Sequence, residues 1–116
     1  MPVVFIVSPE WRLRGALRAE LREEGIAAMG METVDDMAKT IARGIAPDLV
    51  VLDSGHLHDP STRQSLLNLA AHVPFLVIDS RLNPASPLPA AELLFRPVQV
   101  KEIVSRVLAR LGPPHS

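Results

Sequence analysis

Cysteine is absent from this chain of 116 residues, and aromatic residues are scarce. Without cysteine, disulfides, thiolate chemistry and cysteine–zinc sites are all excluded. Aromatics make up 3% of the residues and hydrophobic residues 47%, so the core must be aliphatic, which suits parallel strands packed against helices. The formal net charge is only −1, so neither a strong attraction to nucleic acid nor one to a membrane is expected.

The N-terminal segment has no features of a targeting sequence. Residues 1–7 carry no basic region and no small-residue cleavage site, and their apolar run is too short to span a bilayer. We therefore expect a cytoplasmic protein. The length corresponds to one domain, which we expect to cover residues 1–112, with 113–116 as a tail or the start of a linker.

Apolar runs alternate with helical patterns along the chain, which predicts an α/β fold with a parallel sheet and helices on both faces. The fourth connection, residues 81–91, carries three prolines, a spacing that no regular helix tolerates. The expected strands are residues 3–7, 26–31, 48–53, 74–79 and 93–95.

Helix starts are predicted from capping residues. Ser8 is expected to be the N-cap of the first helix with Pro9 in its first position, and Thr33 to open the second. Asp59 and Pro60 should begin a third helix that runs to about residue 72. The last helix, residues 100–111, should use its apolar stripe against the sheet and leave these side chains outward: Lys101, Glu102, Ser105, Arg106 and Arg110.

In open parallel sheets, ligands bind at the C-terminal ends of the strands. A carboxylate at the end of a buried strand, such as Asp53, is suited to accept a phosphoryl group or to hold a cation. Either use requires more acid nearby and a positioned cation or hydroxyl. The residues at the expected strand ends are Ser8, Pro9, Asp53, Ser54, Asp79, Ser80 and Arg96.

Structural roles explain several of these residues without any chemistry. Capping accounts fully for Ser8 and Pro9, and Asp53 has a second interpretation as a paired or capping strand-end residue. A metal site could draw on Asp53 with His56, His58 and Asp59, but a His-x-His pair in a loop is typical of exposed polar sequence. Neither a glycine-rich phosphate loop nor a nucleophile elbow is present.

Pro47–Asp53 is the most specific segment of the chain, a proline and an aspartate followed by an apolar run and a second aspartate. Three further segments accompany it: Phe5-Ile6-Val7, Pro74–Ile78 and Phe95-Arg96-Pro97-Val98. With these segments, the chain resembles a response-regulator receiver domain from Val3 to Leu111. The resemblance implies the flavodoxin-like receiver fold, a five-stranded parallel sheet of order 2-1-3-4-5, with its fourth helix eroded or absent here.

The resemblance also assigns site positions, of which only one keeps the residue of the family. Asp53 matches the phosphoacceptor aspartate. Ser8 and Pro9 stand where the family has an acidic pair that binds Mg²⁺, and Arg96 replaces the lysine that contacts the phosphoryl group. Asp79 takes the place of the switch threonine or serine, and Ser80 follows it where a small residue is usual.

These changes remove the oxygen ligands that Mg²⁺ needs and add a negative charge near the phosphoryl position. We therefore predict that Arg96 pairs with Asp53, Asp79 or both. The resemblance then implies a phosphorylation-independent protein-interaction module in two-component-type signal transduction, which is not an enzyme and needs no cofactor. Its partner would be a signalling kinase or an output domain, and a homodimer is a further option.

Two alternatives remain open at this point. The first is a receiver that accepts a phosphoryl group on Asp53 from a histidine kinase, with Mg²⁺ as cofactor. The second, more distant, is a small α/β enzyme that uses Asp53, Asp79 and Arg96 in a closed pocket around the strand ends.

Overall fold

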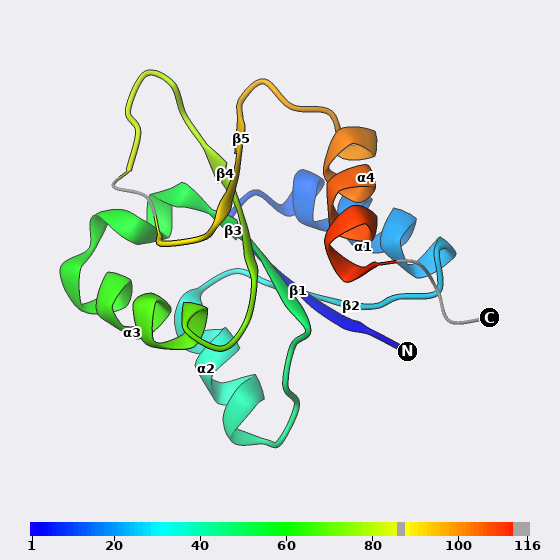
Figure 1. The fold of residues 1–116 in the computed structure, drawn as a ribbon, viewed down its shortest axis with the longest axis horizontal. Helices are drawn as coiled ribbons and strands as arrows, with labels where there is room; N and C mark the ends of the chain where they lie inside the picture. Colours follow the sequence, from blue (N-terminus) through cyan, green and yellow to red (C-terminus); the bar gives the residue numbers. More distant parts are fainter. Residues whose placement is uncertain (86–87, 113–116) are drawn as a thin grey trace.

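A single parallel sheet organises the chain in the computed structural model, which describes residues 1–85 and 88–112 (Figure 1). Its strands are β1 (Val3–Val7), β2 (Ala27–Met31), β3 (Leu49–Asp53), β4 (Phe75–Asp79) and β5 (Glu92–Phe95). They lie in the order β2-β1-β3-β4-β5, and every neighbouring pair is parallel. The predicted α/β fold and its strand order are therefore confirmed.

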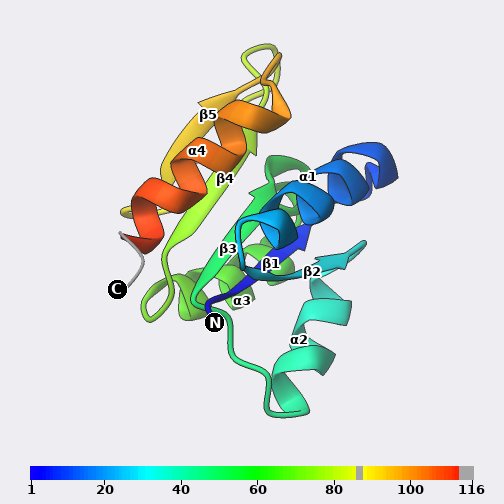
Figure 2. The same cartoon turned by 90° about the vertical axis from the view of Figure 1, so that its right-hand side faces the viewer.

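Helices cover both faces of the sheet, as the alternating pattern predicts. α1 (Trp11–Glu23) and α4 (Val100–Leu111) lie on one face, and α2 (Val34–Ala42) and α3 (Pro60–Ala70) on the other (Figures 1 and 2). The predicted outward residues of α4 are all exposed. No helix of the described residues has the length and apolar character that crossing a membrane would require.

Two apolar layers, one on each face of the sheet, form the core. Alternate residues of β3 point to opposite layers: Leu49 and Val51 pack towards α1 and α4, whereas Val50 and Leu52 pack towards α2 and α3. The central strands are buried on both sides, which explains why they read as continuous apolar runs. Aliphatic side chains dominate both layers, as the composition predicts.

Two of the three predicted helix starts are confirmed. The hydroxyl of Thr33 accepts a hydrogen bond from the N–H of Asp36 at 3.1 Å, and the carboxylate of Asp59 accepts one from the N–H of Thr62 at 2.9 Å. α3 ends at Ala70, slightly before the predicted end. Residues 54–58, which the sequence places in a loop, form a short 3₁₀ helix, η1 (Ser54–His58), with Asp53 at its N-cap.

The predicted start of the first helix is wrong. α1 begins at Trp11, with Glu10 as N-cap. Ser8 directly follows β1 and continues its hydrogen bonding to β2, because its N–H donates to the carbonyl of Met31 at 3.0 Å. Its hydroxyl accepts from the N–H of Glu10 at 3.1 Å, which makes a local turn and not a helix cap.

The connection between β4 and β5 contains no helix in its described residues, 80–85 and 88–91, so the expected loss of the fourth helix is confirmed there. Two of its three prolines, Pro84 and Pro89, are described and exposed; Pro87 lies outside the described residues, as does the expected tail, 113–116. Leu88 is buried in the α2–α3 layer and attaches the connection to the core.

We expect Leu66→Ala to lower the free energy of unfolding by about 2–5 kcal/mol, because Leu66 is 0% exposed and the truncation leaves a cavity. Leu82→Ala is the matched control, since Leu82 is 98% exposed, and its effect should stay within about 0.5 kcal/mol. Urea denaturation of both variants measures the difference. Equal effects of the two substitutions would contradict the burial assigned here to α3.

Candidate functional site

Polar side chains from three segments meet at the C-terminal edge of the sheet. Asp53 ends β3, Ser8 and Glu10 follow β1, and Arg96 follows β5. β1 and β3 are adjacent and parallel, so their ends lie side by side. This is also the point where the strand order reverses, the usual place for a ligand site in open α/β sheets.

Asp53 is held through both carboxylate oxygens. Oδ2 accepts from Nη2 of Arg96 at 2.8 Å and, at 3.4 Å, from the hydroxyl of Ser8, while Oδ1 accepts from the N–H of Gly55 at 3.0 Å. The side chain of Asp53 is only 12% exposed. The sequence-based prediction of an Arg96–Asp53 ion pair is thus confirmed.

Opposing effects act on the pKa of the Asp53 carboxyl. Burial alone would raise it, but the hydrogen bonds from Arg96 and Gly55, with the positive charges of Arg96 and His56, outweigh burial and place the pKa below its ordinary value of 3.8. On Arg96, burial opposes the charge and the two nearby carboxylates more than compensate, so the pKa of the guanidinium is raised. Both partners are therefore charged at neutral pH.

Glu10 is a site residue that sequence reasoning missed. The same Nη2 atom of Arg96 lies 3.1 Å from Oε2 of Glu10, so one guanidinium bridges two carboxylates. Nothing local in the sequence shows that the side chain of Glu10 turns towards the end of β5, and Glu10 is therefore absent from the predicted site. The available signal was an acidic residue just beyond the Ser8-Pro9 pair that ends the first strand.

Ser8 and Pro9 occupy different surroundings although they are adjacent. Ser8 is 2% exposed, and its carbonyl accepts a hydrogen bond from Nη1 of Arg14 at 2.7 Å. Its hydroxyl is hydrogen-bonded to Asp53 and Glu10, so the buried polar groups of Ser8 have partners. Pro9 is exposed and offers no side-chain donor or acceptor. Of the two positions, only Ser8 reaches Asp53.

Asp79 and Ser80 lie at the end of β4 but do not join the cluster. Oδ1 of Asp79 accepts from the N–H of Ser80 at 2.8 Å and from the N–H of Ala85 at 3.3 Å, so this buried carboxylate holds the first residues of the β4–β5 connection. The hydroxyl of Ser80 accepts from the N–H of Leu82 at 3.3 Å. The predicted option of an Arg96–Asp79 side-chain pair is not found; these residues meet only through their backbones, Arg96 N–H to Asp79 C=O at 2.9 Å.

His56 lies beside Asp53, and its Nε2 atom is buried without a hydrogen-bond partner. Burial lowers the pKa of this imidazole below its ordinary value, and the charge of Asp53 opposes that effect only in part. Within residues 1–85 and 88–112, no group of three or more His, Asp or Glu side chains is arranged to hold a metal ion. The interpretation of His56, His58 and Asp59 as metal ligands with Asp53 gains no support.

The cluster does not fit Mg²⁺ as it stands. Mg²⁺ requires a near-octahedral set of oxygen ligands and favours carboxylates. Here the guanidinium of Arg96 lies between the carboxylates of Asp53 and Glu10, where a shared cation would have to bind. Ser8 adds only a neutral hydroxyl.

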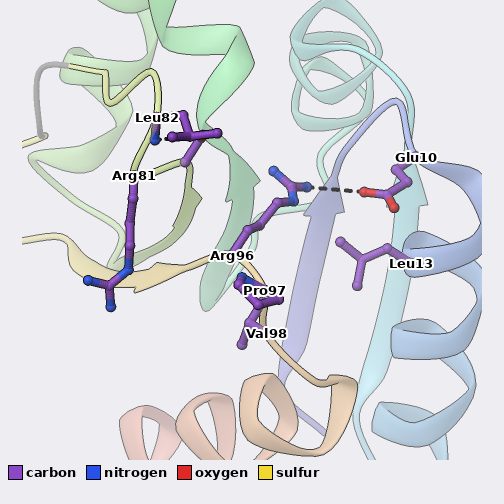
Figure 3. Close-up of a pocket in the computed structure, with 8 residues that line it drawn as sticks. Glu10, Leu13, Arg81, Leu82, Arg96, Pro97 and Val98 are labelled. Carbon is purple, nitrogen blue, oxygen red and sulfur yellow. Dashed lines mark hydrogen bonds and ion pairs between the residues drawn. The ribbon is translucent and has the colours of Figure 1, made fainter.

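A pocket of about 420 Å³ lies beside the cluster (Figure 3). In this view the side chains of Glu10 and Arg96 point towards each other and meet, while the guanidinium of Arg81 points away from them. The guanidinium of Arg81 lies over the ring of Phe95, 5.0 Å from its centroid. Neither Asp53 nor Asp79 lines the pocket. Its lining residues are Glu10, Leu13, Ser80, Arg81, Leu82, Arg96, Pro97 and Val98.

Solved structures of receiver domains share this architecture. A response regulator receiver protein from Burkholderia phymatum aligns with a TM-score of 0.76 at 24% sequence identity, over 97% of this chain and 96% of that one. The non-phosphorylated receiver domain of HemR from Leptospira biflexa aligns over 100% of both chains, with a TM-score of 0.71 and 24% identity. A two-component response regulator from Clostridium difficile aligns with a TM-score of 0.74 at 18% sequence identity, over 96% of each chain. The chain has the receiver fold.

No protein-family model and no curated protein matches the sequence. What this chain shares with receiver domains is therefore the fold. Within the receiver fold, the end of β3 carries Asp53, and the ends of β1 and β5 carry the groups that contact it.

We expect Arg96→Met to lower the free energy of unfolding by about 1–2 kcal/mol, because it leaves the carboxylate of Asp53 without its charged hydrogen-bond donor. Arg106→Met is the matched control. It breaks an ion pair with Glu92 in which the arginine side chain is 52% exposed, and should cost about 0.3 kcal/mol. Urea denaturation at pH 7 measures both. An Arg96→Met variant as stable as Arg106→Met would show that the bridge contributes nothing.

The stability that the Asp53 carboxylate contributes should decrease at low pH. Since the pKa of Asp53 is lower in the folded protein than its ordinary 3.8, the paired carboxylate stabilises the fold fully above that pH, and this stabilisation is lost as the pH falls through the folded-state pKa. In Arg96→Met the pKa of Asp53 should rise. A carboxyl-carbon NMR titration of Asp53 measures the shift, and an unchanged pKa would contradict the assigned cause.

Proposed function

We propose that this chain is an atypical receiver domain that acts as a phosphorylation-independent protein-interaction module in two-component-type signal transduction. The observation that carries the proposal is the bridge from Arg96 to Asp53 and Glu10, with distances of 2.8 and 3.1 Å from one nitrogen atom. The bridge supplies within the protein the positive charge that a phosphoryl-accepting site would take from a metal ion. The bridge therefore favours a site that is held in one conformation without phosphorylation.

The surroundings of Asp53 support the same proposal. One oxygen of the carboxylate is bound by Arg96 and the other by the N–H of Gly55, so both oxygens already share electron density with donors of the protein and are weaker nucleophiles for it. No second carboxylate comes from the positions of Ser8 and Pro9. Asp79, in the place of the switch hydroxyl, accepts hydrogen bonds from backbone N–H groups and has no hydroxyl to donate.

The alternative function is a receiver that accepts a phosphoryl group on Asp53 from a histidine kinase. The lowered pKa of Asp53 favours it, because the nucleophile of such a reaction is the ionised carboxylate. It still requires a cation to neutralise the phosphoryl oxygens, and Arg96 would have to leave Glu10 or Asp53 to take that part. The bridged geometry is better suited to the first function.

The partner under the proposed function is another protein: a signalling kinase, an output domain or a second copy of the chain. The solved neighbours include the receiver domain of the hybrid histidine kinase CckA, at 19% identity and a TM-score of 0.69, over 95% of this chain and 99% of that one. The connection before β5, which has no helix in residues 80–85 and 88–91, gives this face a shape that differs from a receiver with five helices. The polar residues of α4 on this face are exposed. A cytoplasmic location fits such a role.

The proposal predicts that acetyl phosphate with Mg²⁺ leaves the protein unmodified. Intact-mass spectrometry immediately after the incubation should show no phosphoryl adduct, because Arg96 binds Oδ2 of Asp53 and its guanidinium lies where Mg²⁺ would have to bind. A receiver domain with the complete acidic pair, treated in parallel, is the positive control. A stable adduct that disappears in Asp53→Asn would overturn the proposal in favour of the alternative.

A gain-of-function variant tests the same cause from the other side. We expect the combined substitution Ser8→Asp, Pro9→Asp, Asp79→Thr and Arg96→Lys to bind Mg²⁺ and to acquire a phosphoryl adduct, since it restores every group that the resemblance identifies as changed. Adding Asp53→Asn should abolish the adduct. A folded combined variant that stays unmodified would show that features beyond these four positions prevent phosphorylation.

A further inference from the structure

A groove of about 500 Å³ lies between α1 and the edge strand β2, and it shares no lining residue with the pocket beside Arg96. β2 forms the edge of the sheet next to α1 (Figure 2). The groove is lined by Trp11, Arg14, Gly15, Arg18, Arg22, Met29 and Gly30.

The groove concentrates positive charge on a chain whose net charge is −1. Three of its lining residues are arginines and none is acidic. In the described part of the chain, none of the three forms an ion pair with a carboxylate. Arg18 has no hydrogen bond to any described residue, and its side chain lies on an exposed position of α1.

The arginines form one stripe. Arg14, Arg18 and Arg22 repeat every four residues, so their Cα atoms follow each other at about 6 Å along the helix axis. Trp11 stands one turn before Arg14 on the same side of α1, and 67% of its surface is exposed. Tryptophan and arginine are the residue types that most often dominate the binding energy of protein interfaces.

The backbone of β2 is less available than its edge position suggests. The carbonyl of Ala28 already accepts from Nε of Arg22 at 3.3 Å. The stem of Arg14 crosses Gly30 so closely that a Cβ there would come within 2.8 Å of Cγ of Arg14. The arginines thus protect the free edge against pairing with another strand, and what they present to a partner is side-chain charge.

We propose that this groove binds an acidic helix of a partner protein, with a glutamate every fourth residue facing the arginine stripe. A helix with this spacing repeats its carboxylates at the same interval of about 6 Å as the arginines, so three pairs can form in register. An apolar side chain one turn further along that helix packs against Trp11. The proposal rests on the interaction role proposed above and names the surface that performs it.

A nucleic acid strand would also bring negative charges at regular intervals, but it fits the chain less well. Proteins that bind nucleic acid through charge usually have a strongly basic domain, whereas this chain has a pI of about 6.4. The adjoining depression on the β2 side mixes Glu32 and Asp36 with Lys39 and Arg43, so a purely positive lining does not continue beyond the groove along the path of a longer polyanion. The arginine stripe therefore matches a short acidic segment better than a long nucleic acid strand.

The test uses the single tryptophan of the chain as its reporter. The probe is a synthetic helical peptide with glutamate at three positions four residues apart and leucine one turn beyond them; its partner control has glutamine at the same positions. We expect the glutamate peptide to change the emission of Trp11 saturably, the affinity to fall as salt is added, and the glutamine peptide to bind at least roughly tenfold more weakly.

Arg18→Glu should lower the affinity for the glutamate peptide by roughly tenfold or more, because a repulsive charge replaces an attractive one. Arg18→Gln only removes the attractive charge and should lower the affinity by a smaller factor. Arg110→Glu makes the same charge change on an exposed position of α4 and should leave the affinity within about twofold. Circular dichroism confirms that each variant is folded.

Equal binding of the two peptides, or equal affinity of Arg18→Glu and Arg110→Glu, would overturn the proposal. So would a single-stranded oligonucleotide that binds in an Arg18-dependent manner where the glutamate peptide does not. The groove proposal and the proposal of a phosphorylation-independent site can fail separately. Asp53→Asn leaves the lining of the groove unchanged, so this variant should still bind the glutamate peptide. Whether Asp53 accepts a phosphoryl group is decided only by the experiment with acetyl phosphate.

Discussion

A carboxylate that is only 12% exposed at the end of a buried strand needs a partner of opposite charge, and Arg96 satisfies this need for Asp53. The requirement comes from the sheet itself: β3 is covered on both faces, and its last residue sits where β1 and β3 end together. The 3₁₀ helix after β3 and the turn after β1 both begin with hydrogen bonds within this cluster. The local backbone of two connections is therefore tied to one ion pair.

Much of the fold could be read from the sequence, because the signals that decide it are local or periodic. Continuous apolar runs identify the buried strands, and capping residues such as Thr33 and Asp59 mark helix starts that the structure contains. The proline spacing after β4 excludes a helix there without any tertiary information. Arg96 and Asp53 could be paired in advance because both follow strands that end at the same edge of the sheet.

The parts that sequence reasoning missed depend on choices among equally good local solutions. Ser8 could cap a helix or close a strand, and the pairing of its N–H with Met31 of β2 decides for the strand. Asp79 could face Arg96 or turn to its own connection, and two nearby N–H groups decide for the latter. The groove depends on how α1 lies against β2, which places Arg14 over Gly30, and no periodicity in either segment encodes that relation.

The reach of the Arg96 bridge along the chain has a kinetic consequence. Arg96 lies 86 positions from Glu10 and 43 from Asp53, so the bridge closes two long loops of chain. Such contacts raise the contact order, and we expect them to form late in folding, because they require the ends of β1, β3 and β5 to be brought together in one sheet. An interaction made after the folding barrier stabilises the native state chiefly by slowing its unfolding. We therefore expect the loss of the Arg96 bridge to speed unfolding more than it slows folding.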